Sequence, residues 1–158
     1  MQPNGKASSR FVWPPTIYAT ATLIAGLLTW LSPMTFLPAA YRFLALGVGI
    51  AAIVSGAGLI FAAGRGFRRA GTPVAPTRPS TAVVTSGIYR WTRNPMYLGM
   101  SLVLGGIGLA TGSLWFLMAL PVAIIAVTKL AIEREERYLA EVFGAPYLDY
   151  KTRVRRWF

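Results

Sequence analysis

The sequence contains neither cysteine nor histidine. Without cysteine the chain cannot form a disulfide bond, bind a metal through thiolates or attack a substrate through sulfur. Without histidine it lacks both the side chain that most often acts as a general base near neutral pH and the usual ligand of zinc. We therefore predict no metal site, and any reaction that the protein catalyses has to proceed without these groups.

Charged residues are also scarce, at 13% of the chain, and five Asp and Glu stand against 16 Lys and Arg, a net charge of +11. Hydrophobic residues make up 54%, and the mean hydropathy is +0.51. This composition is typical of a multi-pass membrane protein. A high positive charge can also indicate a nucleic-acid partner. Here the basic residues flank apolar stretches, so we predict membrane lipids rather than nucleic acid as partners.

Four apolar stretches predict an all-α fold, a polytopic membrane helical bundle with about four transmembrane helices, as a single domain over residues 1–158. The predicted spans are residues 15–31, 43–63, 95–110 and 113–131. Only "TG" separates the last two, so we expect a tight antiparallel pair. A cleavable signal peptide is the alternative interpretation of the first stretch, which is long for that role.

The distribution of lysine and arginine predicts the orientation. Of the 16, 15 lie in residues 1–14, 64–95 and 129–158, which a four-span topology places on one side of the membrane, and Arg42 is the exception. By the positive-inside rule both termini and the middle loop are cytoplasmic. We therefore predict a multi-pass integral membrane protein, in the inner or plasma membrane if the chain is bacterial.

Glycine and other small residues gather in "GVGIAAIVSGAG" (47–58) and "GGIGLATG" (105–112). Small residues on a helix face let two backbones approach closely, so we predict that most of them serve helix packing. Pro121 should kink the fourth span, because proline removes a backbone hydrogen bond.

The stretch "TSGIYRWTRNPMYLG" (85–99) leads into the third span. Asn94 and Pro95 are the expected N-cap and first-turn pair of a helix, so the span should begin here with unpaired N–H groups that attract anions. Two arginines and two tyrosines surround this end: Tyr89, Arg90, Arg93 and Tyr97. The arginines supply positive charge, and the tyrosines supply flat rings with a polar hydroxyl. The ordinary alternative is a capped helix whose arginines reach the membrane interface.

Acidic residues are concentrated where the fourth span ends. Four of the five acids lie within nine residues: Glu133, Glu135, Glu136 and Glu141. Glu135 and Glu136 point about 100° apart on a helix, so at least one should face the bundle. The alternative is a solvated helix with surface pairs such as Glu133 with Arg137. After Gly144, the aromatic and basic residues of "YLDYKTRVRRW" predict a cytoplasmic amphipathic helix on the membrane surface.

The short connection between the third and fourth spans should bring these two charged elements together, within cytoplasmic regions at residues 72–99 and 131–158. A cation, an anion, aromatic rings and a helix N-terminus then meet at the cytoplasmic end of the helix pair. A zwitterionic, partly aromatic small molecule fits such a site, with its carboxylate toward the arginines and its ammonium or hydroxyl groups toward the glutamates.

The pattern "SGIYRWTRNPMYLG", a hydrophobic hairpin and then "EREERYLAEVFGAPYLDYKTRVRRW" resembles the isoprenylcysteine carboxyl methyltransferase family, which is grouped with the phospholipid methyltransferases. The resemblance covers residues 81–157. It implies an integral membrane enzyme that uses S-adenosylmethionine, releases S-adenosylhomocysteine and methylates a lipophilic acceptor: a carboxylate, a thiol or a phospholipid amine. Such an acceptor would enter sideways from the membrane, and Pro121 and the glycine-rich faces are candidates for the opening.

Carried over by position, the resemblance implies a set of cofactor-binding residues, two of which, Glu135 and Glu136, are also the candidate catalytic residues. The set is Thr81, Ala82, Val83, Val84, Tyr89, Arg93, Asn94, Pro95, Met96, Tyr97, Glu135 and Glu136. The chain departs from the family at two positions. Asn94 replaces a histidine that many members carry, and Ala131 stands where the prenylcysteine enzymes have a substrate-binding arginine, which argues against a prenylcysteine carboxylate as acceptor.

Two other functions are compatible with the sequence. Sterol reductases that use NADPH share a similar C-terminal arrangement, although they are much longer. A small four-span protein without enzymatic activity is the second alternative; a transporter is disfavoured because the predicted spans carry no ionisable residue away from their ends. Neither the identity of the acceptor nor the oligomeric state follows from the sequence.

Overall fold

The computed structural model describes residues 13–73 and 80–157, where all regular structure is helical apart from one isolated bridge between Thr35 and Ser113. In chain order the elements are α1 (Pro14–Leu31), the short 3-10 helix η1 (Ala39–Tyr41), α2 (Arg42–Arg69), the 3-10 helix η2 (Gly87–Arg90), α3 (Pro95–Thr111), α4 (Leu114–Val127), the π-helical turn η3 (Thr128–Ile132), α5 (Glu133–Phe143) and α6 (Ala145–Arg153). The predicted all-α class is confirmed for this part of the chain.

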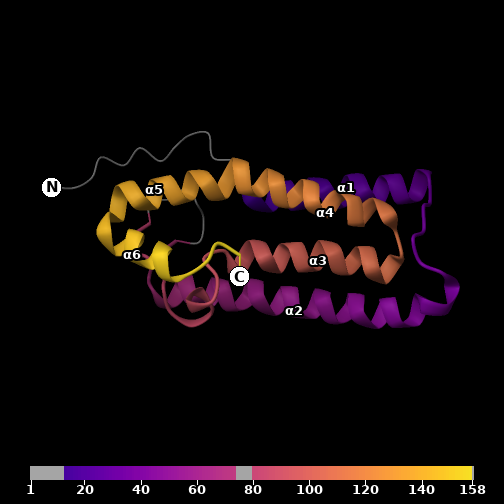
Figure 1. Ribbon diagram of the computed structural model, residues 1–158, viewed down its shortest axis with the longest axis horizontal. Coiled ribbons are helices and arrows are strands. Elements are labelled where there is room, and N and C mark those ends of the chain that lie inside the picture. The colour runs from indigo at the N-terminus through magenta and orange to yellow at the C-terminus, as the bar shows by residue number, and fades with distance from the viewer. Residues whose placement is uncertain (1–12, 74–79, 158) are drawn as a thin grey trace.

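The four longest helices, α1 to α4, lie side by side along the longest axis of the molecule (Figure 1). α2 packs on α3, and α1 packs on α4 and α3. α5 prolongs α4 past the end of this bundle, and α6 turns back toward it (Figure 1). The charged segments before α3 and after α4 therefore meet at one end, as predicted, while the short loops lie at the other.

Within residues 13–73 and 80–157, two helical stretches are long and apolar enough to cross a membrane, Ala39–Arg69 and Leu114–Phe143, and Pro95–Thr111 is a shorter apolar helix. α2 leaves large apolar side chains uncovered, with Phe43 86% and Val54 66% exposed, as expected of a helix that faces lipid. α1 and α3 form where the first and third spans are predicted. That all four helices cross the bilayer stays a prediction.

Glycines close the seam between α2 and α3. A Cβ atom on Gly56 would lie 2.5 Å from the carbonyl oxygen of Gly99, and one on Gly49 would lie 2.6 Å from that of Gly106. No side chain fits at such distances, so the predicted packing role of these glycines is confirmed. The expectation that these glycine-rich faces open a lateral passage is wrong for this seam, because the two backbones touch there.

The connection between α3 and α4 is as tight as predicted. Gly112 ends α3 in the left-handed region, with φ of 67°, and its N–H donates to the carbonyl oxygens of Gly108 and Leu109. α1 is fastened to this turn, because the hydroxyls of Thr29 and Ser113 share a hydrogen bond of 2.6 Å. These contacts hold the bundle at the end opposite the charged segments.

α4 and α5 form one continuous helix through the π-helical turn η3, which the sequence pattern did not predict. Gly144, with φ of 57°, ends α5 where the sequence predicts a break, and α6 follows at once. α6 buries Tyr147 and Tyr150 within the protein. Its predicted place on the membrane surface stays a prediction.

Candidate functional site

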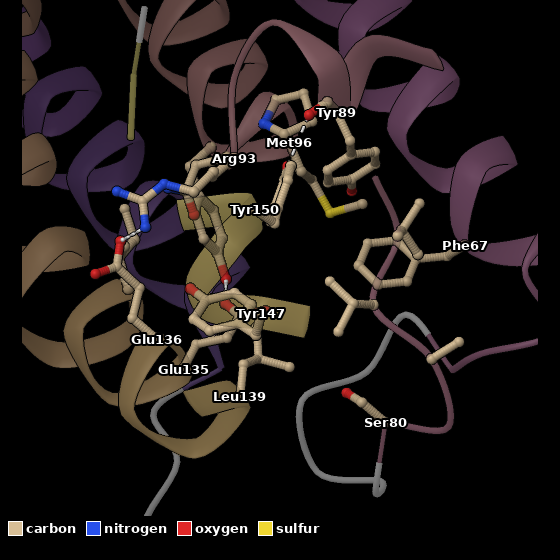
Figure 2. A pocket seen from close by; sticks show the side chains of 17 residues that line it. Phe67, Ser80, Tyr89, Arg93, Met96, Glu135, Glu136, Leu139, Tyr147 and Tyr150 are labelled. Carbon is tan, nitrogen blue, oxygen red and sulfur yellow. Dashed lines mark hydrogen bonds and ion pairs between the residues drawn. The ribbon is translucent and has the colours of Figure 1, made fainter. Parts of the chain in front are cut away.

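A pocket opens at the charged end of the bundle, with about 790 Å³ of space, part of it open to solvent. Its lining residues are Phe67, Ser80, Ala82, Val83, Val84, Tyr89, Arg93, Asn94, Pro95, Met96, Tyr97, Ile132, Glu135, Glu136, Leu139, Tyr147 and Tyr150. Figure 2 shows the side chains of α5 and α6 on one side of this space and Phe67 of α2 with Ser80 on the other.

All the predicted site residues except Thr81 line this pocket. Thr81 instead makes contacts with the end of α2: its N–H donates to the hydroxyl of Thr72 at 3.0 Å, and its own hydroxyl donates to the carbonyl oxygen of Gly71 at 3.2 Å. It therefore ties the segment before α3 to the end of α2, while its neighbour Ser80 faces the pocket. Thr81 does not line the pocket, and its contact with a cofactor stays a prediction.

Glu135 links α5 to the first turn of α3. The hydroxyl of Tyr97 donates a hydrogen bond of 3.0 Å to its Oε2. α5 is charged and lies beyond the apolar part of the helix, yet burial raises the pKa of the Glu135 carboxyl above its usual range. The bond from Tyr97 partly offsets this increase, and the neighbouring charge of Glu136 adds to it. Glu135 is thus an acid held in the pocket wall with an increased affinity for protons.

Glu136 is in the opposite electrostatic situation, although it is the next residue. It is 6% exposed and accepts two hydrogen bonds of 2.9 Å from Arg156, one to each carboxylate oxygen. Arg93 and Lys151 approach within 3.2 and 3.4 Å. Burial raises the pKa of Glu136, but the bonds from Arg156 and the surrounding positive charges outweigh it, so that the pKa is lowered. Glu136 therefore remains ionised as the centre of an ion cluster.

The surface pairing considered for α5 differs from the one observed. Glu133 pairs with Lys129, whose Nζ lies 2.7 Å from its Oε1, rather than with Arg137 as the alternative interpretation expected. Lys129 lies one turn before Glu133, in η3. The solvated pair thus spans the junction of η3 and α5, and the two following acids are left for the interior.

The side chain of Arg93 is largely buried, and some of its donor atoms make no hydrogen bond within the described residues. Its side chain is 10% exposed, and its Nη1 lies 3.2 Å from Glu136. That contact lacks hydrogen-bond geometry, and neither Nη1 nor Nε has a hydrogen-bond acceptor among the described residues. Buried donors normally find an acceptor, so these atoms suit an anionic group of a ligand. Arg90, expected beside Arg93, is instead exposed and does not line the pocket.

Asn94 occupies the predicted N-cap position, with Pro95 starting α3. Its side chain, however, makes no capping bond to the helix. The amide instead donates to the carbonyl oxygen of Arg156 at 3.0 Å. The prediction of the helix start is confirmed, but the Asn94 side chain binds the segment after α6 instead of capping the helix.

Aromatic residues form much of the wall. Phe67 and Tyr89 meet edge to face, with ring centroids 5.5 Å apart, and the hydroxyl of Tyr150 donates to the carbonyl oxygen of Tyr89 at 2.7 Å. Figure 2 shows Met96 reaching toward the space between Tyr150 and Phe67. Such faces suit a planar ring or a cationic sulfur.

Six lining residues were absent from the predicted set: Phe67, Ser80, Ile132, Leu139, Tyr147 and Tyr150. Tyr147 and Tyr150 carry a usable signal, because they are three residues apart and therefore share one face of a helix that follows a glycine. Nothing in the local pattern marks Phe67, which lies on the long apolar helix α2. Phe67 lines the pocket because α2 continues beyond residue 63, where the predicted span ends.

Comparisons with known proteins bear on this site. A family model described as phospholipid methyltransferase matches residues 44–146. The chain is 36% identical over 78 residues to protein-S-isoprenylcysteine O-methyltransferase of Saccharomyces cerevisiae. The matched region covers 46% of this chain and 30% of that protein. It is 37% identical over 62 residues to an uncharacterized protein of Haemophilus influenzae, covering 39% of this chain and 98% of that protein. No solved structure matches the chain.

Proposed function

We propose a function from the premise that this chain belongs to the phospholipid methyltransferase family: it is an integral membrane methyltransferase that uses S-adenosylmethionine to methylate a lipophilic acceptor. The observation that carries the proposal is the presence, in one pocket, of Arg93, whose Nε and Nη1 make no hydrogen bond among the described residues, and of the half-buried acid Glu135. The chain spans 30% of the yeast relative, so the activity is inferred from this site and the family together.

The residues of the pocket fit the parts of S-adenosylmethionine. The spare donors of Arg93 would hold its carboxylate, and Glu135 would hold its ammonium or ribose hydroxyl groups. The rings of Phe67 and Tyr147 would cover the adenine and the cationic sulfur. Glu136, already neutralised by Arg156, would contribute by fixing Arg93 rather than by binding charge itself.

When bound, S-adenosylmethionine supplies a methyl group attached to a positively charged sulfur. Transfer by direct displacement depends chiefly on positioning, which suits a site without histidine, cysteine or metal ligands. The apolar side chains of Ile132 and Leu139 would keep water away from the reacting atoms. Tyr97 holds the Glu135 carboxyl in place, where it can take up the proton that an amine or thiol acceptor releases.

The site favours an acceptor that is not a carboxylate. By the resemblance, Ala131 stands where the prenylcysteine enzymes have a substrate-binding arginine; it is fully buried in η3, so that no cation stands at this position. Glu135 next to it would repel a second carboxylate. We therefore favour a lipophilic amine or thiol over a prenylcysteine carboxylate.

For the topology we propose that α1, α2, α3 and α4 all cross the bilayer, with the pocket and both termini in the cytoplasm. The cofactor would then enter from the cytoplasm and the acceptor from the membrane. The closed glycine seam excludes the α2–α3 boundary as the acceptor's route, so the acceptor would pass another face of the bundle.

Calorimetry on the purified protein in lipid nanodiscs tests the proposal. S-adenosylhomocysteine should bind, and Glu135→Gln should weaken its binding at least about tenfold, because a charge-assisted hydrogen bond is replaced by a neutral one. Glu141→Gln is the matched control, since Glu141 is exposed on the same helix and does not line the pocket. Transfer of a labelled methyl group to membrane extracts would then identify the acceptor.

An absence of binding by the wild-type protein, or equal affinity in Glu135→Gln, would contradict the proposal. Binding of NADPH instead of S-adenosylhomocysteine would favour the reductase alternative.

A further inference from the structure

The segment after α6 returns to the start of α3. Val154 is extended, with φ of −121° and ψ of 129°. The N–H of Arg93 donates to the carbonyl oxygen of Arg155 at 3.0 Å, and the side chains of Thr92 and Asn94 both donate to that of Arg156, at 3.1 and 3.0 Å. Three consecutive residues before α3 are thus bound to two carbonyl groups of this segment.

The side chain of Arg156 makes a second connection, to α5. Its Nε and Nη2 each donate to one oxygen of Glu136, both at 2.9 Å. This two-point geometry is available to arginine and not to lysine. The other cations near Glu136 lie further away, with Arg93 at 3.2 Å and Lys151 at 3.4 Å. Trp157 packs against the core of the bundle and anchors the segment.

Arg156 does not line the pocket, yet the residues that it binds do: Asn94 through the backbone, and Glu136 through the side chain. It therefore connects two pocket walls that are contributed by different helices. It also makes both hydrogen bonds to the carboxylate of Glu136, while Nη1 of Arg93 lies 3.2 Å from that carboxylate without hydrogen-bond geometry.

We propose that Arg156 is a positioning residue, which sets the distance between α3 and α5 and keeps Arg93 available to the ligand. This inference rests on the proposed function, since the ligand is taken to be the cofactor. Without Arg156, the buried carboxylate of Glu136 attracts Arg93 more strongly, because a buried charge requires a partner. The pocket then loses its anion-binding donors, although every lining side chain is retained.

Binding of S-adenosylhomocysteine to Arg156→Gln, Arg156→Lys and the wild-type protein tests the inference. We expect a loss of about tenfold or more for Gln and a partial rescue by Lys, which restores the charge but not the two-point geometry. Arg153→Gln is the matched control, because Arg153 is exposed, lies outside the pocket and carries the same charge. It should bind as the wild type does. Equal affinity in Arg156→Gln and the wild type would overturn the inference.

Hydrogen exchange without ligand separates this inference from the proposed function. The Arg93 amide, bonded to the carbonyl oxygen of Arg155, should exchange faster in Arg156→Gln than in Arg153→Gln. If the wild type binds no S-adenosylhomocysteine, the proposed function fails, while exchange still reports whether Arg156 holds the start of α3. Unchanged exchange at that amide would overturn the positioning role.

A double variant covers the case in which Arg156→Gln does not fold. Arg156→Gln with Glu136→Gln removes both charges together, which is better tolerated than removing one partner of a buried pair. If the two residues act as one unit, the double variant should lose no more affinity than Glu136→Gln alone. A further independent loss of about tenfold from the second substitution would contradict the proposed coupling.

Discussion

The hydroxyl of Tyr97, in the first turn of α3, donates a 3.0 Å hydrogen bond to Oε2 of Glu135 in α5. The two residues are 38 positions apart in the sequence and are brought together because α3 and α4 form a hairpin. This bond is one of the direct contacts between the two charged elements that the sequence marks, beside the ion pair of Arg93 with Glu136. It fixes the carboxyl that we propose to face the cofactor's positive groups.

Tyr97→Phe should weaken binding of S-adenosylhomocysteine. Loss of the hydroxyl removes a hydrogen bond to a charged group, with a cost of about 1.5–3 kcal/mol for the ionised carboxylate. Calorimetry at neutral pH would measure the change. Tyr138→Phe is the control, because Tyr138 lies on α5 outside the pocket. Equal losses in the two variants would show that the effect is not specific to the bond with Glu135.

Cofactor affinity should decrease in acid at a higher pH than the ordinary range of a glutamate. Burial raises the pKa of Glu135, so the carboxylate that would hold a cation takes up its proton early as the pH falls. The pKa of Glu136 is lowered, so Glu136 does not contribute to this decrease. Titration of binding against pH would measure it. The decrease should disappear in Glu135→Gln, and its persistence there would assign it to another group.

The same shift predicts the effect of Glu135 on stability. The folded protein binds this proton more tightly than the unfolded chain, so the contribution of Glu135 to the free energy of unfolding decreases as pH rises through its raised pKa. Glu135→Gln should therefore be more stable than the wild type at neutral pH, and this difference should vanish in acid. Thermal unfolding at both pH values would measure it. A variant that is less stable than the wild type at neutral pH would contradict the assignment.

The glycine seam predicts opposite effects of one substitution at neighbouring positions of α2. Gly56→Ala forces a Cβ against the backbone of α3 and should destabilise the protein by about 1–3 kcal/mol. Gly58 has no atom within 4 Å of its Cβ position, so Gly58→Ala should stabilise the helix by about 0.5–1 kcal/mol. Unfolding midpoints in detergent would compare the two variants. Destabilisation of equal size at both positions would exclude the seam as its cause.

Single cysteines would test the topology, because the chain has none of its own. Thr35, between α1 and η1, and Asp149, in α6, are both exposed. α6 and the connection from α1 to α2 lie at opposite ends of the bundle (Figure 1). In intact cells a membrane-impermeant maleimide should label Thr35→Cys and not Asp149→Cys, while both should react after lysis. Labelling of Asp149→Cys in intact cells would place the pocket on the outer side and reject the proposed orientation.

Much of the fold follows from local signals in the sequence. The apolar stretches predict the helices, the glycines of α2 and α3 predict the close contact between these two helices, and "TG" predicts the hairpin of α3 and α4. η3 gives no comparable signal, because a π-helical turn has the same apolar composition as the helix around it. The packing of α6 against the protein could not be predicted from the sequence either. Its tyrosines satisfy the pattern of a membrane-surface helix equally well when they face the protein.

The site was predictable where residues are close in sequence to the start of α3, and less so elsewhere. The different states of Glu135 and Glu136 depend on Arg156, which is 20 residues beyond Glu136 and reaches α5 through an extended segment. No periodicity encodes such a contact. Phe67 likewise enters the pocket because α2 extends beyond the apolar region that hydropathy identifies.

The π-helical turn at Thr128–Ile132 has a consequence for how this enzyme family could diversify. Each of its hydrogen bonds spans one residue more than those of an α-helix, so the helix can shed a residue there without any change in its loops. Such a deletion would turn η3 into ordinary α-helix and leave both glutamates facing their present partners, because the wider turn absorbs the extra residue. The helix could therefore lose one residue at this turn while every acid and arginine of the charged end keeps its place.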